Sequence, residues 1–148
     1  MSFAGNSAGR MVVVGLALAL SGPALAEIAT VKRVTGAASI ERNKKPVPIT
    51  AGTKLEVGDL LNTGKDGRIS VTFIDDSRFS VGPASRIRLT KFDFDDVTHQ
   101  GQSATKVEKG SLAVVSGQIA KENPKGMTVQ TPTSVLGVRG TRFVVTVQ

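Results

Sequence analysis

Residues 59–89 read D-L-L-N-T-G-K-D-G-R-I-S-V-T-F-I-D-D-S-R-F-S-V-G-P-A-S-R-I-R-L, and this stretch decides the fold class. It holds three short runs in which apolar and polar residues alternate, at 68–73, 78–81 and 86–89. Successive side chains on a β-strand point to opposite faces of the sheet, so each run gathers its apolar residues on one face. The glycines and aspartates between the runs favour tight turns. The pattern predicts an antiparallel β-meander with one apolar face and one solvated face.

The rest of the chain after residue 27 predicts more short strands and no long helix. Apolar residues do not recur at helical spacing, whereas strand-sized runs recur between Gly, Pro and Asp residues. The expected fold is therefore all-β, either an antiparallel, meander-rich β-sandwich or a short β-solenoid-like domain. We expect an edge strand at 28–34, a polar loop at 97–105, and buried side chains at Phe73 and Phe143, each of which alternates with polar neighbours in its run.

Composition excludes several classes of function. The chain has no Cys, a single His (His99) and 4% aromatic residues. A disulfide framework, a thiol nucleophile and a thiolate metal site are therefore excluded, and a catalytic triad would depend on His99 alone. The low aromatic content argues against a stacking platform for single-stranded nucleic acid, so no nucleic-acid partner is expected. A formal net charge of +7 favours a polyanion or an acidic protein as partner.

The first 26 residues predict a secretory signal peptide. Arg10 precedes an apolar run at 11–20, and A-L-A at 24–26 is the small-x-small pattern that signal peptidase cleaves. A membrane-spanning helix needs about 20 apolar residues, roughly twice the length of this run. We therefore expect cleavage after Ala26, a β domain at 27–148, a periplasmic or secreted location, and no membrane span after cleavage.

Seven motifs in the mature chain, taken in order, resemble the FecR-like periplasmic domain, a family named for the regulator of iron-citrate transport. They are G-A-A-S-I (36–40), V-G-D-L-L-N-T-G (57–64), D-D-S (75–77), P-A-S-R-I-R-L (83–89), V-E-K-G-S-L (107–112), V-Q-T-P (129–132) and V-R-G-T-R-F-V-V (138–145). The usual family turn is D-G-S, and here Asp76 replaces the glycine. That substitution is expected to affect the turn type and not the strand pairing.

The resemblance implies an all-β domain without enzymatic activity or a cofactor. In the best-known members this domain relays a signal from an outer-membrane receptor to a cytoplasmic sigma factor. Here we expect a signal peptide in place of the cytoplasmic segment and membrane helix, and we expect no short receptor-contacting domain after the β domain. The resemblance therefore favours an exported module that binds another macromolecule in the cell envelope, for signalling or assembly.

Three arginines are the candidate partner-binding residues. Arg78, Arg86 and Arg88 occupy polar positions of the predicted meander, so they can form one basic stripe on its solvated face. The alternative is an ordinary solvated strand surface, since surface strands commonly carry Lys and Arg. A partner strand could instead pair with a sheet edge, at 31–34 or at the final strand.

Other candidate sites have simpler interpretations. Asp93, Asp95 and Asp96 offer only three carboxylates, fewer than a calcium loop requires, so a solvated acidic turn is favoured. The same cluster is contiguous, whereas a glycan hydrolase places two carboxylates across a cleft. His99 is expected to be a surface residue. Residues 137–141 resemble a phosphate loop only superficially, because no Lys-Ser/Thr and no helix follow. An adhesin or a binder of envelope polyanions remains the main alternative function.

Overall fold

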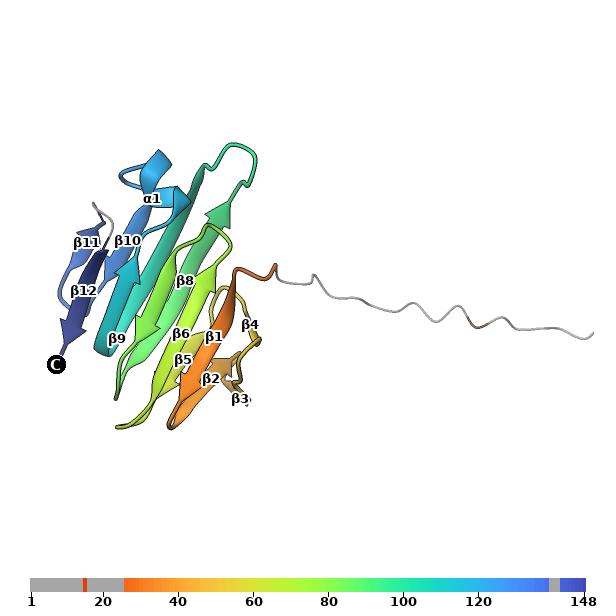
Figure 1. Ribbon diagram of the computed structural model, residues 1–148, viewed down its shortest axis with the longest axis vertical. Coiled ribbons are helices and arrows are strands. Elements are labelled where there is room, and N and C mark those ends of the chain that lie inside the picture. The colour runs from red at the N-terminus through yellow and green to blue at the C-terminus, as the bar shows by residue number, and fades with distance from the viewer. Residues whose placement is uncertain (1–14, 16–25, 139–141) are drawn as a thin grey trace, which may run out of the picture.

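The computed structural model describes residues 15, 26–138 and 142–148, and the described chain from residue 26 onward forms one curled β-sheet (Figure 1). In this part of the chain, twelve strands build a half-barrel and one short helix, α1 (Gln118–Glu122), caps it. The strands are β1 (Ala29–Thr35), β2 (Ala38–Arg42), β3 (Lys45–Val47), β4 (Lys54–Leu55), β5 (Leu60–Thr63), β6 (Arg68–Phe73), β7 (Arg78–Val81), β8 (Arg86–Phe94), β9 (Gly101–Val115), β10 (Met127–Gln130), β11 (Val135–Gly137) and β12 (Arg142–Val147). The predicted all-β antiparallel class is confirmed.

Strand β9 joins the two halves of the half-barrel. Its first part pairs with β8 and, in parallel, with β10, while its last six residues pair with β12 and, over four of them, with β7. From β9 the sheet continues one way through β8, β5, β2 and β3, and the other way through β7, β6, β1 and β4. Gly110 lies where the partners change, with φ of 87°. A Cβ there would lie 2.5 Å from the Cα of Ser85, so this position requires glycine for both its conformation and its close contact.

The prediction of a three-stranded meander is correct for its first strand pairing and wrong for its second. β6 and β7 form the expected hairpin, but β8 pairs with β5 and β9, in the other half of the fold. The connection at 82–85 turns the chain across because Thr63 holds both of its ends. The Thr63 hydroxyl donates to the carbonyl oxygen of Gly82 (2.6 Å) and accepts from the N–H of Ser85 (2.9 Å).

Aromatic side chains join the two halves through the core. The ring centroid of Phe73 lies 4.4 Å from that of Phe79 on β7 and 5.3 Å from that of Phe92 on β8. Phe73 is 3% exposed, as predicted. Phe143 points to the same interior but is only partly buried, so its prediction was too strong. The reason is its position on β12, an outermost strand that pairs only with β9 among the described strands.

The polar segment at 97–105 is shorter as a loop than predicted. The connection between β8 and β9 ends before Gly101, where β9 begins. Ser103 and Thr105 are buried polar residues on the inner face of β9, so strand pairing continues although the residues are hydrophilic. The start of β9 was predicted as a loop because its residues are hydrophilic, but its inward side chains are small hydroxyl groups that fit the interior.

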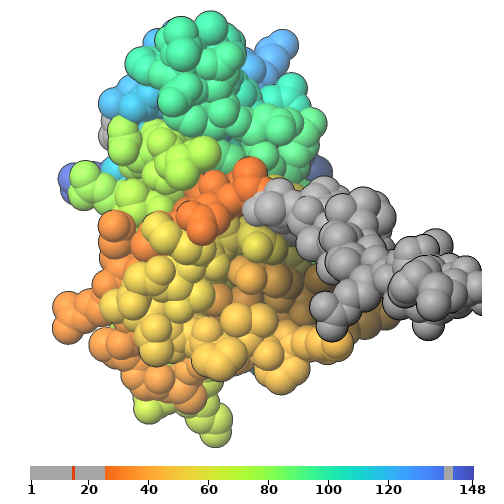
Figure 2. Space-filling view, turned by 90° about the vertical axis from the view of Figure 1, so that its right-hand side faces the viewer, coloured from red at the N-terminus to blue at the C-terminus, as the bar shows by residue number. Residues whose placement is uncertain are grey.

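The two edges of the curled sheet are built differently. At one edge, termed the closed edge, the outer strands β3 and β4 have three and two residues. Residues 52–53 cover β1 beyond β4, because Val31 donates to Thr53 (2.9 Å) and accepts from Gly52 (2.7 Å). The predicted edge strand at 28–34 is therefore largely covered. Figure 2 shows the orange and yellow segments, which include β1 to β4, forming a continuous surface at this edge.

The opposite edge, termed the open edge, consists of β11 and β12 (Figure 1). β12 has six residues and pairs with β9 on one side. Within the described residues, no strand pairs with its other side. The open edge therefore presents a longer unpaired strand than the closed edge does.

Candidate binding surfaces

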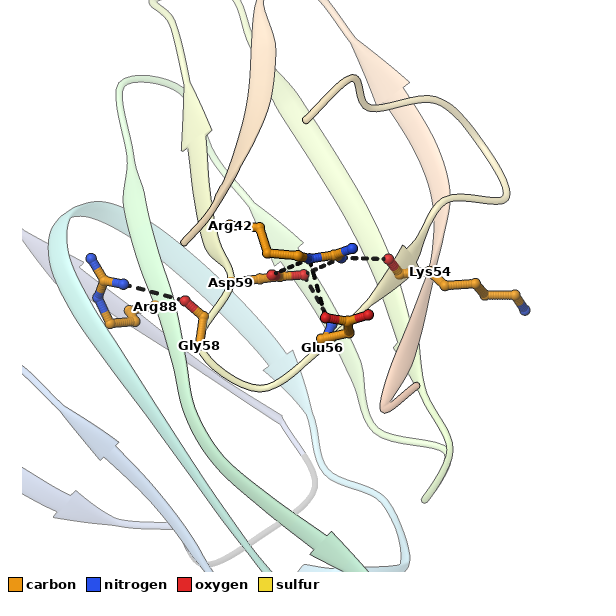
Figure 3. Close-up of polar contacts among 6 residues, drawn as sticks. All are labelled: Arg42, Lys54, Glu56, Gly58, Asp59 and Arg88. Atoms are coloured by element: carbon orange, nitrogen blue, oxygen red, sulfur yellow. Dashed lines mark hydrogen bonds and ion pairs between the residues drawn. The ribbon is translucent and has the colours of Figure 1, made fainter. Parts of the chain in front are cut away.

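Arg86 and Arg88 lie close together on β8 and share one carboxylate. The Nε atom of Arg86 is 3.1 Å from Glu108 on β9, and the Nε atom of Arg88 is 3.7 Å from the other oxygen of the same group. Arg88 also donates to the carbonyl oxygen of Gly58 at 3.3 Å (Figure 3). The positive charge of this pair is therefore partly neutralised and its geometry is partly fixed.

Arg78 lies apart from that pair. It is exposed on β7, opposite Val115 at the end of β9, whereas Arg86 on β8 is opposite Lys109, which lies earlier on β9. The residue across β9 from Arg78 is Arg142 on β12, which is also opposite Val115. The structure thus divides the predicted stripe into an engaged pair on β8 and an arginine near the open edge.

The closed edge contains an ion pair between a partly exposed arginine and a buried carboxylate, which links β2 to the segment before β5 (Figure 3). Asp59 is 0% exposed and accepts from Nε and Nη2 of Arg42, both at 2.8 Å. Asp59 also accepts from the backbone N–H of Glu56 at 2.9 Å, and Arg42 reaches the carbonyl oxygen of Lys54 at 3.1 Å. The two-pronged contact fits the planar guanidinium to the carboxylate and fixes both groups.

The contact between Arg42 and Asp59 has a structural role. The hydrogen bond to Asp59 is the main cause that raises the pKa of Arg42 above its ordinary value. Burial opposes that effect, and the charges of Asp59 and Glu56 add to it. The guanidinium donates both hydrogen bonds to the carboxylate, which holds the two groups in one geometry. The pair holds β2, β4 and β5 together at the closed edge.

A second buried carboxylate organises the turn between β6 and β7. Asp75 is 0% exposed and accepts from the N–H (3.1 Å) and hydroxyl (2.8 Å) of Ser77 and from the N–H of Ile119 (3.3 Å). The Ser77 hydroxyl accepts from the N–H of Gly117 at 3.0 Å. The D-D-S motif therefore ties the hairpin to the start of α1. Asp76 has φ of 67°, the conformation that the usual glycine adopts readily, and the β6–β7 pairing is retained.

The acidic cluster is exposed, with Asp93 near the end of β8 and Asp95 and Asp96 in the turn between β8 and β9. Asp95 accepts from the N–H groups of Val97 (2.9 Å) and Thr98 (3.3 Å), and these backbone bonds lower the pKa of Asp95. Among the described residues, no group of three acidic or histidine side chains is placed to hold a metal ion. His99 is exposed and stacks on Phe94, with ring centroids 6.2 Å apart.

Sequence reasoning missed the buried roles of Asp59 and Asp75 and the position of Arg142. Both aspartates stand inside motifs quoted for the family resemblance, at turns that begin or end a strand. Their polar partners come from residues 17 and 44 positions away in sequence, which no local pattern reveals. Of the superficial phosphate loop, Gly137 belongs to β11, and 139–141 lie outside the described residues, as do 1–14 and 16–25 of the predicted signal peptide.

The fold and its surfaces define an all-β domain whose exposed chemistry suits contact with another macromolecule. A family model described as FecR protein matches residues 59–148, so the chain belongs to the FecR protein family. FecR domains are non-catalytic regulatory domains, typically periplasmic and associated with envelope signalling and sigma-factor regulation. No curated protein and no solved structure matches the chain.

No helix in the described ranges is both long and apolar enough to cross a membrane.

Proposed function

We propose that this protein is an exported, non-enzymatic FecR domain that binds another protein of the cell envelope, as a signalling or assembly module. The observation that carries the proposal is the family match over 59–148, because FecR domains are regulatory and work through protein partners. Export is supported by the signal-peptide pattern that ends at Ala26, a residue exposed next to the domain. The proposed location is the periplasm or the exterior of the cell.

The distribution of charged groups supports binding over hydrolysis. Asp59 and Asp75 are buried and committed to arginine, hydroxyl and backbone partners. Asp93, Asp95 and Asp96 follow one another at the end of β8 and in the turn after it, where they cannot flank a sugar ring from two sides. Arg78, by contrast, is exposed and forms no ion pair among the described residues, and Arg86 and Arg88 share a single carboxylate, so the basic groups retain charge for an acidic partner. A polyanion binder or adhesin is the second candidate, favoured by the net charge of +7.

Export is tested by sequencing the N-terminus of the protein recovered from the envelope fraction. The expected first residue is Glu27, because peptidase cleaves after A-L-A. A chain that keeps residues 11–20 and remains in the membrane fraction would contradict this part of the proposal.

The contact is tested by capture from envelope extract with the purified full chain. Arg78, Arg86 and Arg88 are the proposed contact residues, and replacing all three with Glu is expected to abolish capture while the fold is retained. Arg78→Glu is also tested separately from the Arg86→Glu/Arg88→Glu double variant. The double variant removes the ion pairs with Glu108 as well as the positive charge. Capture that weakens steeply with salt and yields only lipopolysaccharide or acidic glycan would favour the polyanion binder instead.

A further inference from the structure

This inference rests on the proposed function and names its surface and the chemistry of its partner. We propose that the open edge binds an extended, acidic segment of a partner protein, which adds as a strand to β12. The segment would lie beside the outer face formed by β7, the end of β9 and β12.

The backbone of β12 is the first requirement for strand addition. Alternate residues of an antiparallel strand direct their N–H and C=O groups toward opposite neighbours. β12 has six residues and pairs with β9 on one side, so about half of its backbone groups face the open side. Its length is about 20 Å at the usual rise per residue. β3 and β4 are too short for this, and Pro46 removes one donor from β3.

The outer face of the sheet beside β12 has a shallow, apolar hollow at its centre. Ser80, Ala113 and Val144 stand side by side across β7, β9 and β12. Val144 is 68% exposed, and the small residues next to it leave a shallow hollow of about 530 Å³. Such a hollow accepts one or two side chains from the partner strand. These side chains would fix the register of the added strand, while backbone hydrogen bonds make the rest of the contact.

The positive charge beside the hollow indicates the composition of the partner strand. Arg78 and Arg142 flank the hollow, one on each side of Val115, with Cα atoms about 10 Å apart from the usual strand spacing. All twelve Asp and Glu residues of the chain lie in its described part, and none forms an ion pair with either arginine. A strand with carboxylates on one face would supply the missing counter-charge. A second copy of β12 would not, because its sequence R-F-V-V-T-V contains no acidic residue.

The test is an NMR titration of the purified full chain with a capped seven-residue peptide that alternates Glu and Val. We expect amide shifts and slower hydrogen exchange in β12, with smaller changes in β3. A peptide that alternates Lys and Val is expected to bind at least 10-fold more weakly. An acidic peptide with every backbone amide methylated is expected to lose the protection of β12, because neither of its edges can then donate backbone hydrogen bonds to the strand.

The matching variant is Arg78→Glu with Arg142→Glu, which should weaken the acidic peptide at least 10-fold. The control is Lys32→Glu with Arg33→Glu on β1, two exposed residues with the same change in charge. Unchanged circular dichroism and melting temperature establish that both variants are folded. Equal weakening by both variants, or acidic-peptide binding without protection of β12, would overturn the inference, because either result means nonspecific attraction to a basic protein.

The two proposals fail in different ways. Suppose that an envelope protein is captured, that the Arg78→Glu/Arg142→Glu variant captures it equally, and that β12 gains no protection in the complex. The proposed function then stands and the open edge is not its contact. If the acidic peptide binds β12 as described but no envelope protein is captured, the strand site stands and the proposed function loses its support.

Discussion

The closed edge and the open edge of the half-barrel solve the same problem in opposite ways. Both leave strands without a neighbour, which exposes backbone groups to other chains. At the closed edge the outer strands are short, Pro46 interrupts one of them, and Arg42 is fixed by Asp59 (Figure 3). At the open edge, formed by β11 and β12 (Figure 1), β12 is longer than these outer strands. Val144 is exposed there, and Arg142 has no carboxylate partner among the described residues.

The difference teaches where stability and where binding are placed. An arginine with a fully buried partner contributes to holding the fold together, since its loss leaves an uncompensated charge. An exposed arginine without a partner contributes little to stability and remains available to another molecule. Substitutions at the two edges should therefore separate unfolding from loss of contact.

The largest effect is expected in the core that joins the two halves. Phe73→Ala should lower the free energy of unfolding by about 4 kcal/mol, because the ring is buried between Phe79 and Phe92. Phe143→Ala should cost only about 1–2 kcal/mol, since half-burial on β12 forfeits part of the transfer energy. Urea denaturation measures both. Equal losses would show that the open edge is as tightly packed as the centre.

The next effect concerns the ion pair between Arg42 and the buried Asp59. Arg42→Ala should cost about 3 kcal/mol, because Asp59 stays buried without its guanidinium. Arg86→Ala is the matched control and should cost less than about 1 kcal/mol, because its partner Glu108 is 27% exposed and retains access to water. The comparison uses the same denaturation curves. A loss at Arg42 no greater than that at Arg86 would remove the stabilising role given to the closed edge.

A smaller effect is expected from charging the open edge. Val144→Lys should change the free energy of unfolding by less than about 0.5 kcal/mol, because the side chain is 68% exposed. It should nevertheless lower association at high protein concentration, since lysine on an edge strand opposes edge-to-edge pairing. Light scattering reports the association, and Ile74→Lys, at an exposed turn residue, is the control. Suppression by both variants alike would attribute the effect to net charge.

The smallest effect concerns pH and the exposed turn at Asp95. Its folded pKa is lowered, so its contribution is fully present above the ordinary aspartate value of about 3.9 and is lost as the pH falls through the lowered value. NMR titration of the Asp95 carboxyl carbon should give a midpoint below the ordinary value. The chemical shift of the Val97 backbone N–H should change with the same midpoint, and Asp95→Asn should abolish that change. A midpoint at or above the ordinary value would mean that the backbone hydrogen bonds are absent in solution.

Local pattern recovered the strands that alternate cleanly and failed where partners are distant. β6 and β7 follow from alternation and a tight turn, and Phe73 is buried as its place in β6 predicts. The pairing of β8 does not follow from its own sequence, because it depends on Thr63 holding the connection before it. The partial exposure of Phe143 likewise depends on which strand is outermost, a property of the whole sheet.

The sequence by itself determined the all-β class, most strand positions, the family resemblance and the excess of positive charge, because each depends on residue type and short-range periodicity. Only the tertiary structure decided which charges remain available. It buried Asp59 against Arg42, joined Arg86 and Arg88 to Glu108, and left Arg78 beside Arg142 across β9. The physical reason is that the energy of a charge depends on its burial and its neighbours, and both are set by strand order and register rather than by sequence position.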